Sequence, residues 1–377
     1  MTFLDNFLNT WSALIFDLLK FIKNYLRDRK QRVVIGGHES VLTSVNSGVP
    51  QGSILGPLLF VLFINDLHKS VSTGTNIALY ADDTKIWRQI ESYSDHLILQ
   101  NDINALLEWS NINKMRFHPD KCMVVKVTLQ KEKFMDKFPY RLGTMCLEYV
   151  AVEKDLGVRI TPRLSWNEHC DALIRSASSR LGLTKRTCHF VKNRRQRLTF
   201  YKTMVRSMFQ HCSEVWRPST KVALSKFEAL QKRAVKWIFM EDYEHYSENT
   251  YQRKLKELDL LPIELRFSLS DLKLFFRIIN DEVCIKLPDY LELISPDELV
   301  SGPGNSEITR LRQTHKDPLY FVCNITDRVN VFRNSFFYRA HTLWNRLPVG
   351  LRLIRDSVQF DDKLKEYLME LSQPEPD

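Results

Sequence analysis

Two adjacent carboxylates, Asp82 and Asp83, are the side chains whose types and spacing most clearly indicate chemistry. They follow the apolar residues 76–80 and precede residues 84–87, which end in a tryptophan. Apolar segments on both sides of a short acidic tip predict a β-hairpin. Two carboxylates held this close favour a neutralising cation, and Mg²⁺ prefers a few carboxylates together with substrate phosphates. The pair therefore predicts phosphoryl transfer on nucleotides, although two-metal chemistry usually needs carboxylates from more than one strand.

A glycine-containing loop, residues 47–53 with the sequence SGVPQGS, lies upstream of the acidic pair. Glycine at such a position lets the backbone approach a base pair or an incoming nucleotide closely. The apolar residues 54–64 then predict a buried helix, and Pro57 suits its first turn because the missing N–H costs nothing there. The structural alternative for this loop is an ordinary helix-entry turn.

The composition indicates a folded protein with a basic surface. Of the 377 residues, 44% are apolar and 11% are aromatic, which is enough for a sizeable core. The net charge is +9, and residues 175–206 contain ten lysines and arginines but no acidic residue. Such a stripe favours contact with a phosphate backbone, as do Phe190, Phe200 and Tyr201 within it. The alternative is a solvated helical face.

Seven widely spaced cysteines without a Cys-x-x-Cys pair indicate a reduced, intracellular protein. The Cys-His and His-Cys pairs at 188–189 and 211–212 lack the close ligand spacing of known structural zinc sites, so ordinary side chains are favoured there. The N-terminal residues make a poor signal peptide. The longest apolar run, residues 54–64, is too short to cross a bilayer, so no membrane association is predicted.

The apolar spacing predicts hairpins first and helices later. The expected elements are a helix over 16–26, a strand at 33–35 that turns at Gly36 and Gly37 and pairs with 41–45, a helix over 56–67, the acidic hairpin, a helix over 94–110, a strand at 123–127, a hairpin within 149–160, and helices over 167–190, 194–216 and 221–240. A polar linker and a helical C-terminal region follow, with a loop at 301–306 and a frayed end at 373–377.

Three collinear segments resemble the reverse transcriptases of non-LTR (LINE-type) retrotransposons, with the jockey-like and chicken-repeat-like groups nearest. They are SGVPQGSILGPLLF at 47–60, FINDL at 63–67 and YADD at 80–83. A Tyr-x-Asp-Asp sequence alone is a weak signal, but the order of the segments makes this one specific. Further similar segments lie at 29–35, 109–122, 154–158, 215–216, 231–234 and 344–348, so the resemblance extends from about residue 18 to residue 371.

The resemblance implies a role for each residue around the acidic hairpin. Gln51 and Gly52 would contact the dNTP and the template. Asp82 would be the metal ligand and Asp83 its supporting acid, with Mg²⁺ (or Mn²⁺) bridging the triphosphate and the primer 3′-hydroxyl. Tyr80 would brace the hairpin under the primer end. The structural alternative for the acids is an exposed hairpin turn.

The resemblance also implies contacts downstream of the hairpin. Lys121 would neutralise or protonate the leaving pyrophosphate, although His118 stands where the family usually has asparagine; a solvated lysine is the alternative. Leu156 and Gly157 resemble the primer-grip hairpin. The basic helices after Trp166 resemble the thumb, which follows a duplex by its backbone and shape. The thumb residues expected to contact nucleic acid are Lys185, Arg186, Lys192, Arg194, Arg195 and Arg197.

One family motif is not found in this sequence. In the family, a strand upstream of the basic segment 27–32 carries a Phe-x-Asp-x-x-x-Ala-Phe-Asp motif with the first metal-binding aspartate. Asp5 follows a phenylalanine, but too few residues separate it from Tyr25 for the intervening strand, turn and helix, so it is interpreted as a chance match. The sequence is therefore expected to be a C-terminal portion of a retrotransposon polyprotein that is inactive, or nearly so, by itself.

The expected fold class is α+β, with three parts. Residues 1–165 are expected to form part of the fingers and palm, residues 166–245 a helical thumb, and residues 246–377 a C-terminal helical region. The expected function is RNA-directed DNA polymerisation in the parent protein, inside the cell in the nucleus or cytoplasm. The implied partners are an RNA template, a DNA primer or target, and dNTP. A non-catalytic nucleic-acid-binding remnant and a decayed copy without function are the alternatives.

Overall fold

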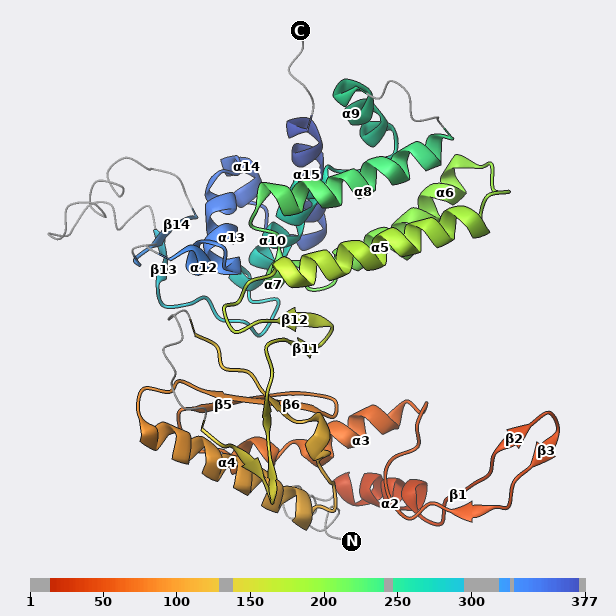
Figure 1. Cartoon of the computed structure of the whole chain (residues 1–377), viewed down its shortest axis with the longest axis vertical. Coiled ribbons are helices and arrows are strands. Elements are labelled where there is room, and N and C mark those ends of the chain that lie inside the picture. The colour runs from red at the N-terminus through yellow and green to blue at the C-terminus, as the bar shows by residue number, and fades with distance from the viewer. Residues whose placement is uncertain (1–13, 129–137, 241–246, 295–318, 326–328, 373–377) are drawn as a thin grey trace, which may run out of the picture. The chain divides into compact units, whose positions relative to one another are not determined.

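The computed structural model describes residues 14–128, 138–240, 247–294, 319–325 and 329–372, which belong to two compact units (Figure 1). The first unit comprises residues 1–124 and 130–150, and the second residues 125–129 and 151–377. Helices combine with two-stranded sheets, which confirms the expected α+β class. The expected loop at 301–306, the chain end at 373–377 and Asp5 lie outside the described residues.

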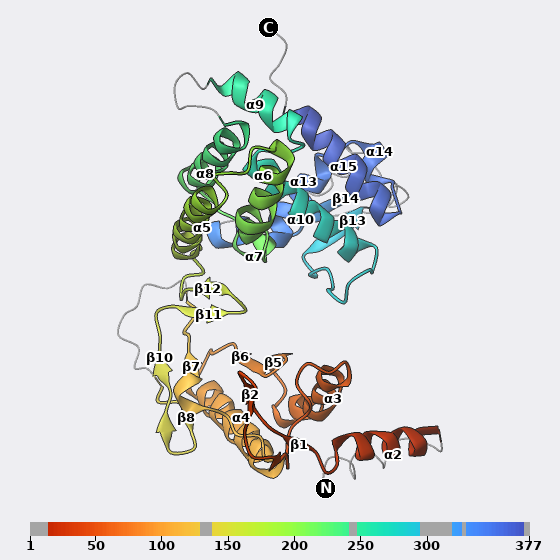
Figure 2. The same ribbon diagram turned by 90° about the vertical axis from the view of Figure 1, so that its right-hand side faces the viewer.

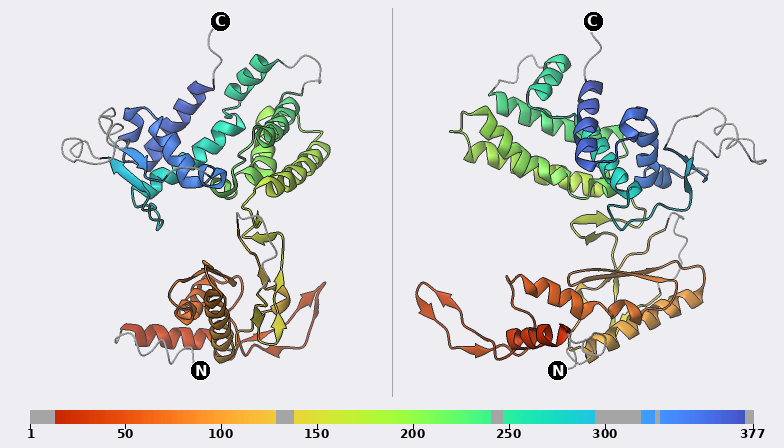
Figure 3. Two further views of the ribbon diagram at one scale, coloured as in Figure 1. Left: turned by 60° about the vertical axis from the view of Figure 1, so that its left-hand side comes forward. Right: turned by 180° about the vertical axis from the view of Figure 1, so that it is seen from behind.

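A helix and a narrow β-ribbon open the first unit. Their bounds are α2 (Leu14–Leu26), β1 (Lys30–Gln31), β2 (Val34–Ile35), β3 (His38–Glu39) and β4 (Thr43–Ser44). Gly36 and Gly37 form the turn between β2 and β3 with φ angles of 56° and 85°, which glycine adopts without steric cost. Across this turn Val34 pairs with Glu39, and Lys30 pairs with Ser44 at the base of the ribbon. The hairpin turn is as predicted, but the predicted pairing of 33–35 with 41–45 is wrong, because the tight turn pairs β2 directly with β3. Figure 3 shows the ribbon extending away from the unit's helices.

The acidic hairpin packs on helical segments of the same unit. Their bounds are α3 (Leu55–Ile64), η1 (Leu67–Ser70), β5 (Thr75–Tyr80), β6 (Asp83–Arg88) and α4 (Tyr93–Ile112). Leu67 is fully buried and shares a core with Ile64, Leu106 and Trp109, against which the inner face of the hairpin packs. Figure 2 shows β5 and β6 together on one side of α4. This core fixes the position of the hairpin relative to α3 and α4.

Short strands complete the first unit. Their bounds, with the 3₁₀ turn before them, are η2 (Pro119–Lys121), β7 (Met123–Val124), β8 (Arg141–Leu142), β9 (Met145–Cys146) and β10 (Glu148–Tyr149). The strand expected at 123–127 is shorter than predicted and pairs in parallel with β10. Tyr140 and Leu142 pack with Ile103 in a second core of this unit.

The second unit begins with a hairpin and continues with helices. Their bounds are β11 (Glu153–Asp155), β12 (Val158–Ile160), α5 (Asn167–Thr187), α6 (Arg194–Phe200), η3 (Tyr201–Val205), η4 (Arg206–Phe209), α7 (Ser213–Trp216) and α8 (Lys221–Phe239). The single helix predicted over 194–216 is wrong, because η3 is π-helical, η4 is 3₁₀ and Cys212 has a left-handed φ of 52°. The Trp216 indole donates to the carbonyl of His211 at 2.7 Å and stabilises this break.

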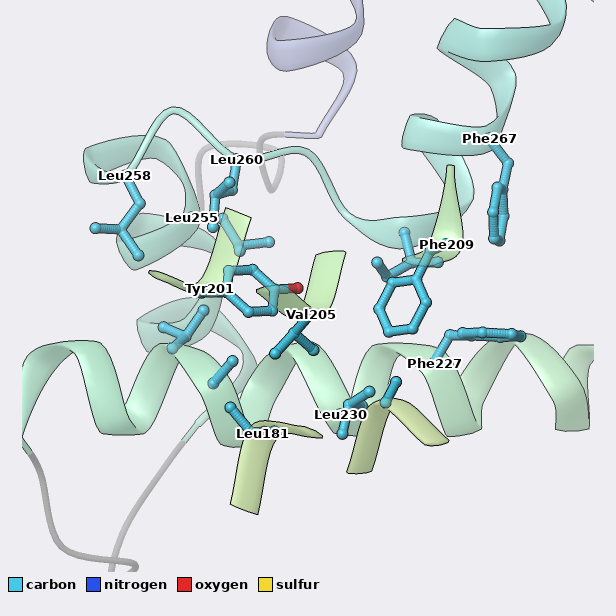
Figure 4. Packing of buried hydrophobic residues seen from close by; sticks show 14 of the residues in the cluster. Leu181, Tyr201, Val205, Phe209, Phe227, Leu230, Leu255, Leu258, Leu260 and Phe267 are labelled. Atoms are coloured by element: carbon cyan, nitrogen blue, oxygen red, sulfur yellow. The ribbon is translucent and has the colours of Figure 1, made fainter. Parts of the chain in front are cut away.

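Aromatic and aliphatic side chains from these helices form a dense core. Figure 4 shows Tyr201 and Val205 between α8, which carries Leu230, and the segment that carries Leu255 and Leu260. The Tyr201 hydroxyl donates to Gln231 at 2.9 Å, so this buried phenol keeps a hydrogen bond. Burial of such large side chains is the main favourable contribution to folding.

The C-terminal part of the second unit is mainly helical, as predicted. Its bounds are α9 (Glu248–Glu257), α10 (Ile263–Ile279), β13 (Leu291–Ile294), β14 (Tyr320–Cys323), α12 (Asn330–Arg333), α13 (Phe336–Asn345), α14 (Val349–Arg352) and α15 (Ser357–Leu371). The antiparallel pair β13–β14 was not anticipated. Phe275 contacts Trp344, and Phe276 stacks on Phe360 at 4.1 Å between ring centroids.

A buried ion-pair cluster joins α10 to two other parts of the second unit. Asp271 is 1% exposed and accepts from Arg217 at 2.8 Å. Arg339 donates to the other carboxylate oxygen at 3.2 Å and also to the carbonyl of Glu214 at 2.7 Å. Because both carboxylate oxygens are paired, the buried charge of Asp271 is compensated.

Candidate active site and nucleic-acid-binding residues

The two acids lie at the tip of the β5–β6 hairpin, as predicted. Tyr80 pairs with Asp83 across the strands, and Ala81 and Asp82 form the two-residue turn. Ala81 has a φ of 49°, in the left-handed region that a residue with a Cβ adopts only at a cost. Such local strain is concentrated at functional sites.

Alternation along both strands places the acidic tip on the outer face of the hairpin. Ile77, Leu79 and Ile86 point to the half-buried side and pack on the core beneath. Asp83 and Tyr80 lie on the opposite face, where Tyr80 is 67% exposed. The inner face therefore holds the hairpin while the outer face presents the acid and the phenol to solvent.

The two carboxylates are the type of ligand that a hard cation prefers, but two are too few to complete a metal site. Asp82 and Asp83 are both exposed, and neither has an ion-pair partner among the described residues. Free carboxylates are the oxygen ligands that Mg²⁺ prefers. Within the described ranges, no group of three or more histidine, cysteine, aspartate or glutamate side chains could hold a metal ion. The pair thus fits part of a metal site.

The loop that contains Gln51 and Gly52 is fixed at both ends. Both residues are exposed, and Gly52 has a φ of 74°. The Ser53 hydroxyl donates to the carbonyl of Pro50 at 2.8 Å and accepts from the Gly56 N–H at 2.9 Å. A Cβ on Gly56 would lie 2.7 Å from that same carbonyl oxygen, so no larger residue fits. The loop tip is therefore held open for contact.

Arg29 anchors the start of this loop. Sequence reasoning had not predicted this role for Arg29. Its guanidinium donates to the carbonyls of Gly48 at 2.5 Å and Ser47 at 3.3 Å, and its Nε donates to Leu26 at 3.0 Å. A single arginine thus links the end of α2 to the loop before Gln51. Its place in the basic segment 27–32 was the only signal in the sequence.

The Gln51 loop, the acidic hairpin and Lys121 all belong to the first unit, but they do not all contact one another. The helix after the Gln51 loop and the acidic hairpin share the core around Leu67. Phe117, which packs against that core, precedes η2, and η2 carries Lys121. The Lys121 side chain is exposed, and the structure gives it no partner among the described residues.

Leu156 and Gly157 form the turn of the β11–β12 hairpin in the second unit. Their φ angles are 46° and 91°, the left-handed conformations of a tight hairpin turn. Nε2–H of His211 donates to the carbonyl of Leu156 at 2.8 Å, and a Cβ on Gly157 would lie 3.2 Å from that nitrogen. Leu156 itself is 43% exposed. His211 therefore fixes a turn whose apolar side chain remains free.

A second histidine supports the same hairpin from α5. The Arg159 N–H donates to Nδ1 of His169 at 3.2 Å, and the His169 ring packs edge-on against Trp216. Burial lowers the pKa of His169 to about 4, and the positive charges of Arg159 and His211 contribute. His169 is thus neutral at physiological pH and acts as an acceptor. Only its sequence position next to a cysteine had drawn attention to His211, and His169 had not been singled out.

The predicted basic stripe separates into exposed and structural side chains. Arg186, Lys192 and Arg195 are exposed, and none has a partner among the described residues. Lys185 donates to the carbonyl of Arg233 at 3.2 Å, and burial lowers its pKa, as does the charge of Arg233.

Two other arginines of the stripe are held by neighbours. Arg194 pairs with Glu257 and lies over the Phe239 ring at 4.3 Å. Arg197 is 5% exposed and donates to the carbonyls of Val191 at 2.6 Å and Trp237 at 2.5 Å. The fold thus uses Arg197 to close its own helix ends.

Comparison with known proteins finds similarity to one class of polymerase. Residues 4–159 match the family model described as reverse transcriptase (RNA-dependent DNA polymerase). The chain is 26% identical over 232 residues to the probable RNA-directed DNA polymerase from transposon BS of Drosophila melanogaster, which covers 58% of this chain and 25% of that protein. It is also 26% identical over 234 residues to the RNA-directed DNA polymerase from mobile element jockey of Drosophila funebris, covering 59% and 25%. The matched part of this chain is therefore similar to the reverse transcriptases of non-LTR retrotransposons.

The reverse transcriptase match contains the Gln51 loop, the acidic hairpin, Lys121 and the Leu156-Gly157 turn. The chain spans about a quarter of the length of the curated relatives it matches. None of the helices in the described parts of the chain is long and apolar enough to cross a membrane.

Proposed function

We propose that this chain is part of an RNA-directed DNA polymerase, which adds dNTP to a DNA primer on an RNA template by two-metal phosphoryl transfer. The observation that carries the proposal is the β5–β6 hairpin, whose inner face is held by the core and whose tip presents two unpaired carboxylates. The fixed loop with the exposed Gln51 and Gly52 lies in the same unit. An acidic hairpin and a nucleotide-contacting loop on one scaffold are what this reaction requires.

In this proposal each candidate site residue of the first unit has one role. Asp82, supported by Asp83, holds Mg²⁺ (or Mn²⁺), and the bound ion supplies charge neutralisation at the triphosphate and the primer hydroxyl. Tyr80, on the same face as Asp83, supports the primer end. Gln51 and Gly52 contact the dNTP and the template through the loop that Ser53 closes.

Lys121, exposed in η2, is proposed to neutralise the leaving pyrophosphate. Leu156 and Gly157 are proposed to hold the primer in the second unit, on the turn that His211 fixes. The basic residues proposed to follow the duplex are Arg186, Lys192 and Arg195, which are exposed and unpaired among the described residues. Lys185, Arg194 and Arg197, predicted with them, are held by other groups of the second unit.

We further propose the division into a fingers and palm part at 1–165, a thumb at 166–245 and a C-terminal region at 246–377. The nucleus or cytoplasm is the proposed location, since RNA and DNA are the proposed partners. Because two carboxylates do not complete a two-metal site, these residues by themselves are proposed to support little or no synthesis.

Primer extension on poly(rA)/oligo(dT) with purified protein, Mg²⁺ and labelled dTTP tests this proposal. We expect the wild type and Asp82→Ala to give the same background. Synthesis that depends on template, Mg²⁺ and Asp82 would refute the inactivity while establishing polymerisation. In parallel, Mn²⁺ electron paramagnetic resonance should detect weak binding that Asp82→Ala removes; equal Mn²⁺ binding by both proteins would contradict the ligand assignment.

A second candidate function is nucleic-acid binding without catalysis. It is favoured by Phe190, which is 68% exposed beside the unpaired side chains of Arg186 and Lys192. An exposed aromatic ring among cations can stack on a base while the cations contact phosphates. Binding in this case is insensitive to Asp82→Ala, which separates it from the polymerase proposal.

A further inference from the structure

We propose that Lys202, Arg206, Arg266 and Lys365 form a binding site for a phosphate group in the second unit. The four side chains come from four elements, namely η3, η4, α10 and α15. Residues 266 and 365 lie outside the basic stripe of residues 175–206, so the sequence does not show the cluster. The proposal does not depend on the polymerase function, because free phosphate suffices to test it.

Two guanidinium nitrogens at this cluster are buried and have no partner. The Nε atoms of Arg206 and Arg266 are both inaccessible to solvent, and neither has a hydrogen-bond acceptor. Neither arginine has an ion pair with any described residue. A buried charged donor without an acceptor is costly. The fold therefore retains two guanidinium groups in a position that an anion would make favourable.

The groups are close enough to repel one another. Burial lowers the pKa of Arg266 to about 10, and the charge of Arg206 contributes to this. Burial also lowers the pKa of Lys202, and Arg206, Lys365 and Arg266 each lower it further. Arg266 therefore keeps its positive charge at neutral pH, and its repulsion with Arg206 persists.

Among the described residues that interact with these four cations, a single carboxylate carries a negative charge. Asp259, in the turn before α10 with a φ of 52°, pairs with Lys365 and acts on Lys202 and Arg206. Three positive charges therefore remain without a counter-charge. Tyr201 adds no negative charge, because burial raises its pKa far above the physiological range.

The chemistry of the cluster selects phosphate among common anions. Guanidinium groups donate in a planar fork that matches the oxygens of phosphate, and lysines add mobile point charges. A phosphate group carries up to two negative charges and several acceptor oxygens, which suits four cations better than one carboxylate does. The phosphate could belong to a nucleic-acid backbone or to free pyrophosphate, since both present the same group.

Isothermal titration of the full chain with inorganic pyrophosphate tests the site. We expect Arg266→Gln and Lys202→Gln each to bind about tenfold more weakly than wild type, because each removes a charge-assisted hydrogen bond. Arg253→Gln is the matched control. Arg253 is exposed on α9, and its substitution removes the same single positive charge. Equal affinities of Arg266→Gln and Arg253→Gln, or absence of binding by wild type, would overturn the proposal.

Thermal unfolding separates loss of the site from loss of the fold. Without pyrophosphate, Arg266→Gln should unfold at or above the wild-type temperature, since one of two repelling guanidiniums is gone. With pyrophosphate at about 100 times its dissociation constant, only wild type and Arg253→Gln should gain several degrees. A gain of the same size in Arg266→Gln would contradict the site.

A DNA oligonucleotide then identifies the source of the phosphate. If Arg266→Gln weakens oligonucleotide and pyrophosphate binding alike, the site takes backbone phosphate. If it weakens pyrophosphate binding alone, the site takes free phosphate. Both results support the site, and unchanged binding of both ligands refutes it.

Discussion

The two units of this chain differ in how completely the described residues cover their apolar side chains. In the second unit, Trp216, Phe275 and Trp344 are fully buried in continuous clusters. In the first unit, α3 is apolar on all sides, yet Ile54 before it is 96% exposed and Leu58 is 56% exposed. A helix that is apolar all round is normally buried. The acidic hairpin thus belongs to the unit whose scaffold is less covered.

The proposed catalytic part and the proposed duplex-binding part are therefore stabilised by different interactions. The first unit depends on small cores around Leu67 and Tyr140 and on anchors such as Arg29. The second unit adds buried ion pairs and polar contacts to large aromatic clusters. We expect the second unit to be the more stable, and each prediction below tests one part of that comparison.

The largest expected effect is in the second unit, at its buried ion-pair cluster. Asp271→Ala leaves Arg217 and Arg339 as uncompensated buried charges, so the free energy of unfolding should fall by about 3–5 kcal/mol. Chemical denaturation of the second unit's transition measures this. Asp289→Ala, at an exposed acid, is the control and should change stability by less than about 0.5 kcal/mol. Equal effects of the two variants would show that the cluster does not hold the unit together.

The next prediction separates the two units by their cores. Calorimetry should show two transitions, with the first unit unfolding at the lower temperature. Leu67→Ala should lower the free energy of unfolding of the first unit alone, by about 2–5 kcal/mol, because Leu67 is fully buried. Phe275→Ala should lower that of the second unit alone, by about 3–5 kcal/mol, for the same reason. A single transition that both variants shift equally would show that the units unfold as one.

A pH-dependent effect between about pH 4 and pH 7 is expected in the second unit. The folded-state pKa of His169, about 4, lies below the unfolded value near 6.5. The unfolded state therefore binds the proton first, and stability is complete above pH 6.5 and falls as the pH drops towards 4. The loss should be on the order of 2 kcal/mol.

His169→Asn isolates this contribution because its side-chain oxygen can still accept from the Arg159 N–H. Between pH 7 and pH 4.5, the stability of this variant should fall less than that of wild type. Parallel pH profiles would show that His169 does not titrate as proposed. The comparison of variants is needed because burial raises the pKa of Glu214 and of Glu228, which changes stability in the opposite direction.

Local signals in the sequence sufficed for part of the fold. The acidic hairpin was predictable because alternation and a two-residue turn lie within a few positions, and α4 because its apolar residues recur at helical spacing. The break at Cys212 was not, since the Trp216 ring that follows it packs on Phe227 and Phe267, which lie further along the chain. The pair β13–β14 was missed because its strands are distant in the sequence and their pairing is not local.

The candidate site shows the same limit at the level of single side chains. Asp82, Asp83 and Gln51 were predicted from the sequence because their motifs are contiguous. Arg29 and His211 were not recognised as anchors, because each contacts a backbone carbonyl far along the chain. Contacts of this kind leave no periodic pattern in the sequence.

The smallest expected effect distinguishes two arginines of one helix. Arg195 is exposed and unpaired, whereas Arg197 is buried and donates to two carbonyls. Arg195→Gln should leave stability within about 0.5 kcal/mol of wild type and reduce the salt slope of oligonucleotide binding by about 1, as expected for one lost phosphate contact. Arg197→Gln should do the reverse, lowering stability by about 1–3 kcal/mol through unpaired carbonyls while the folded fraction keeps the salt slope. Because both variants remove one charge from α6, a difference between them can only come from where each guanidinium lies. Identical salt slopes for Arg195→Gln and wild type would remove Arg195 from the nucleic-acid-binding surface.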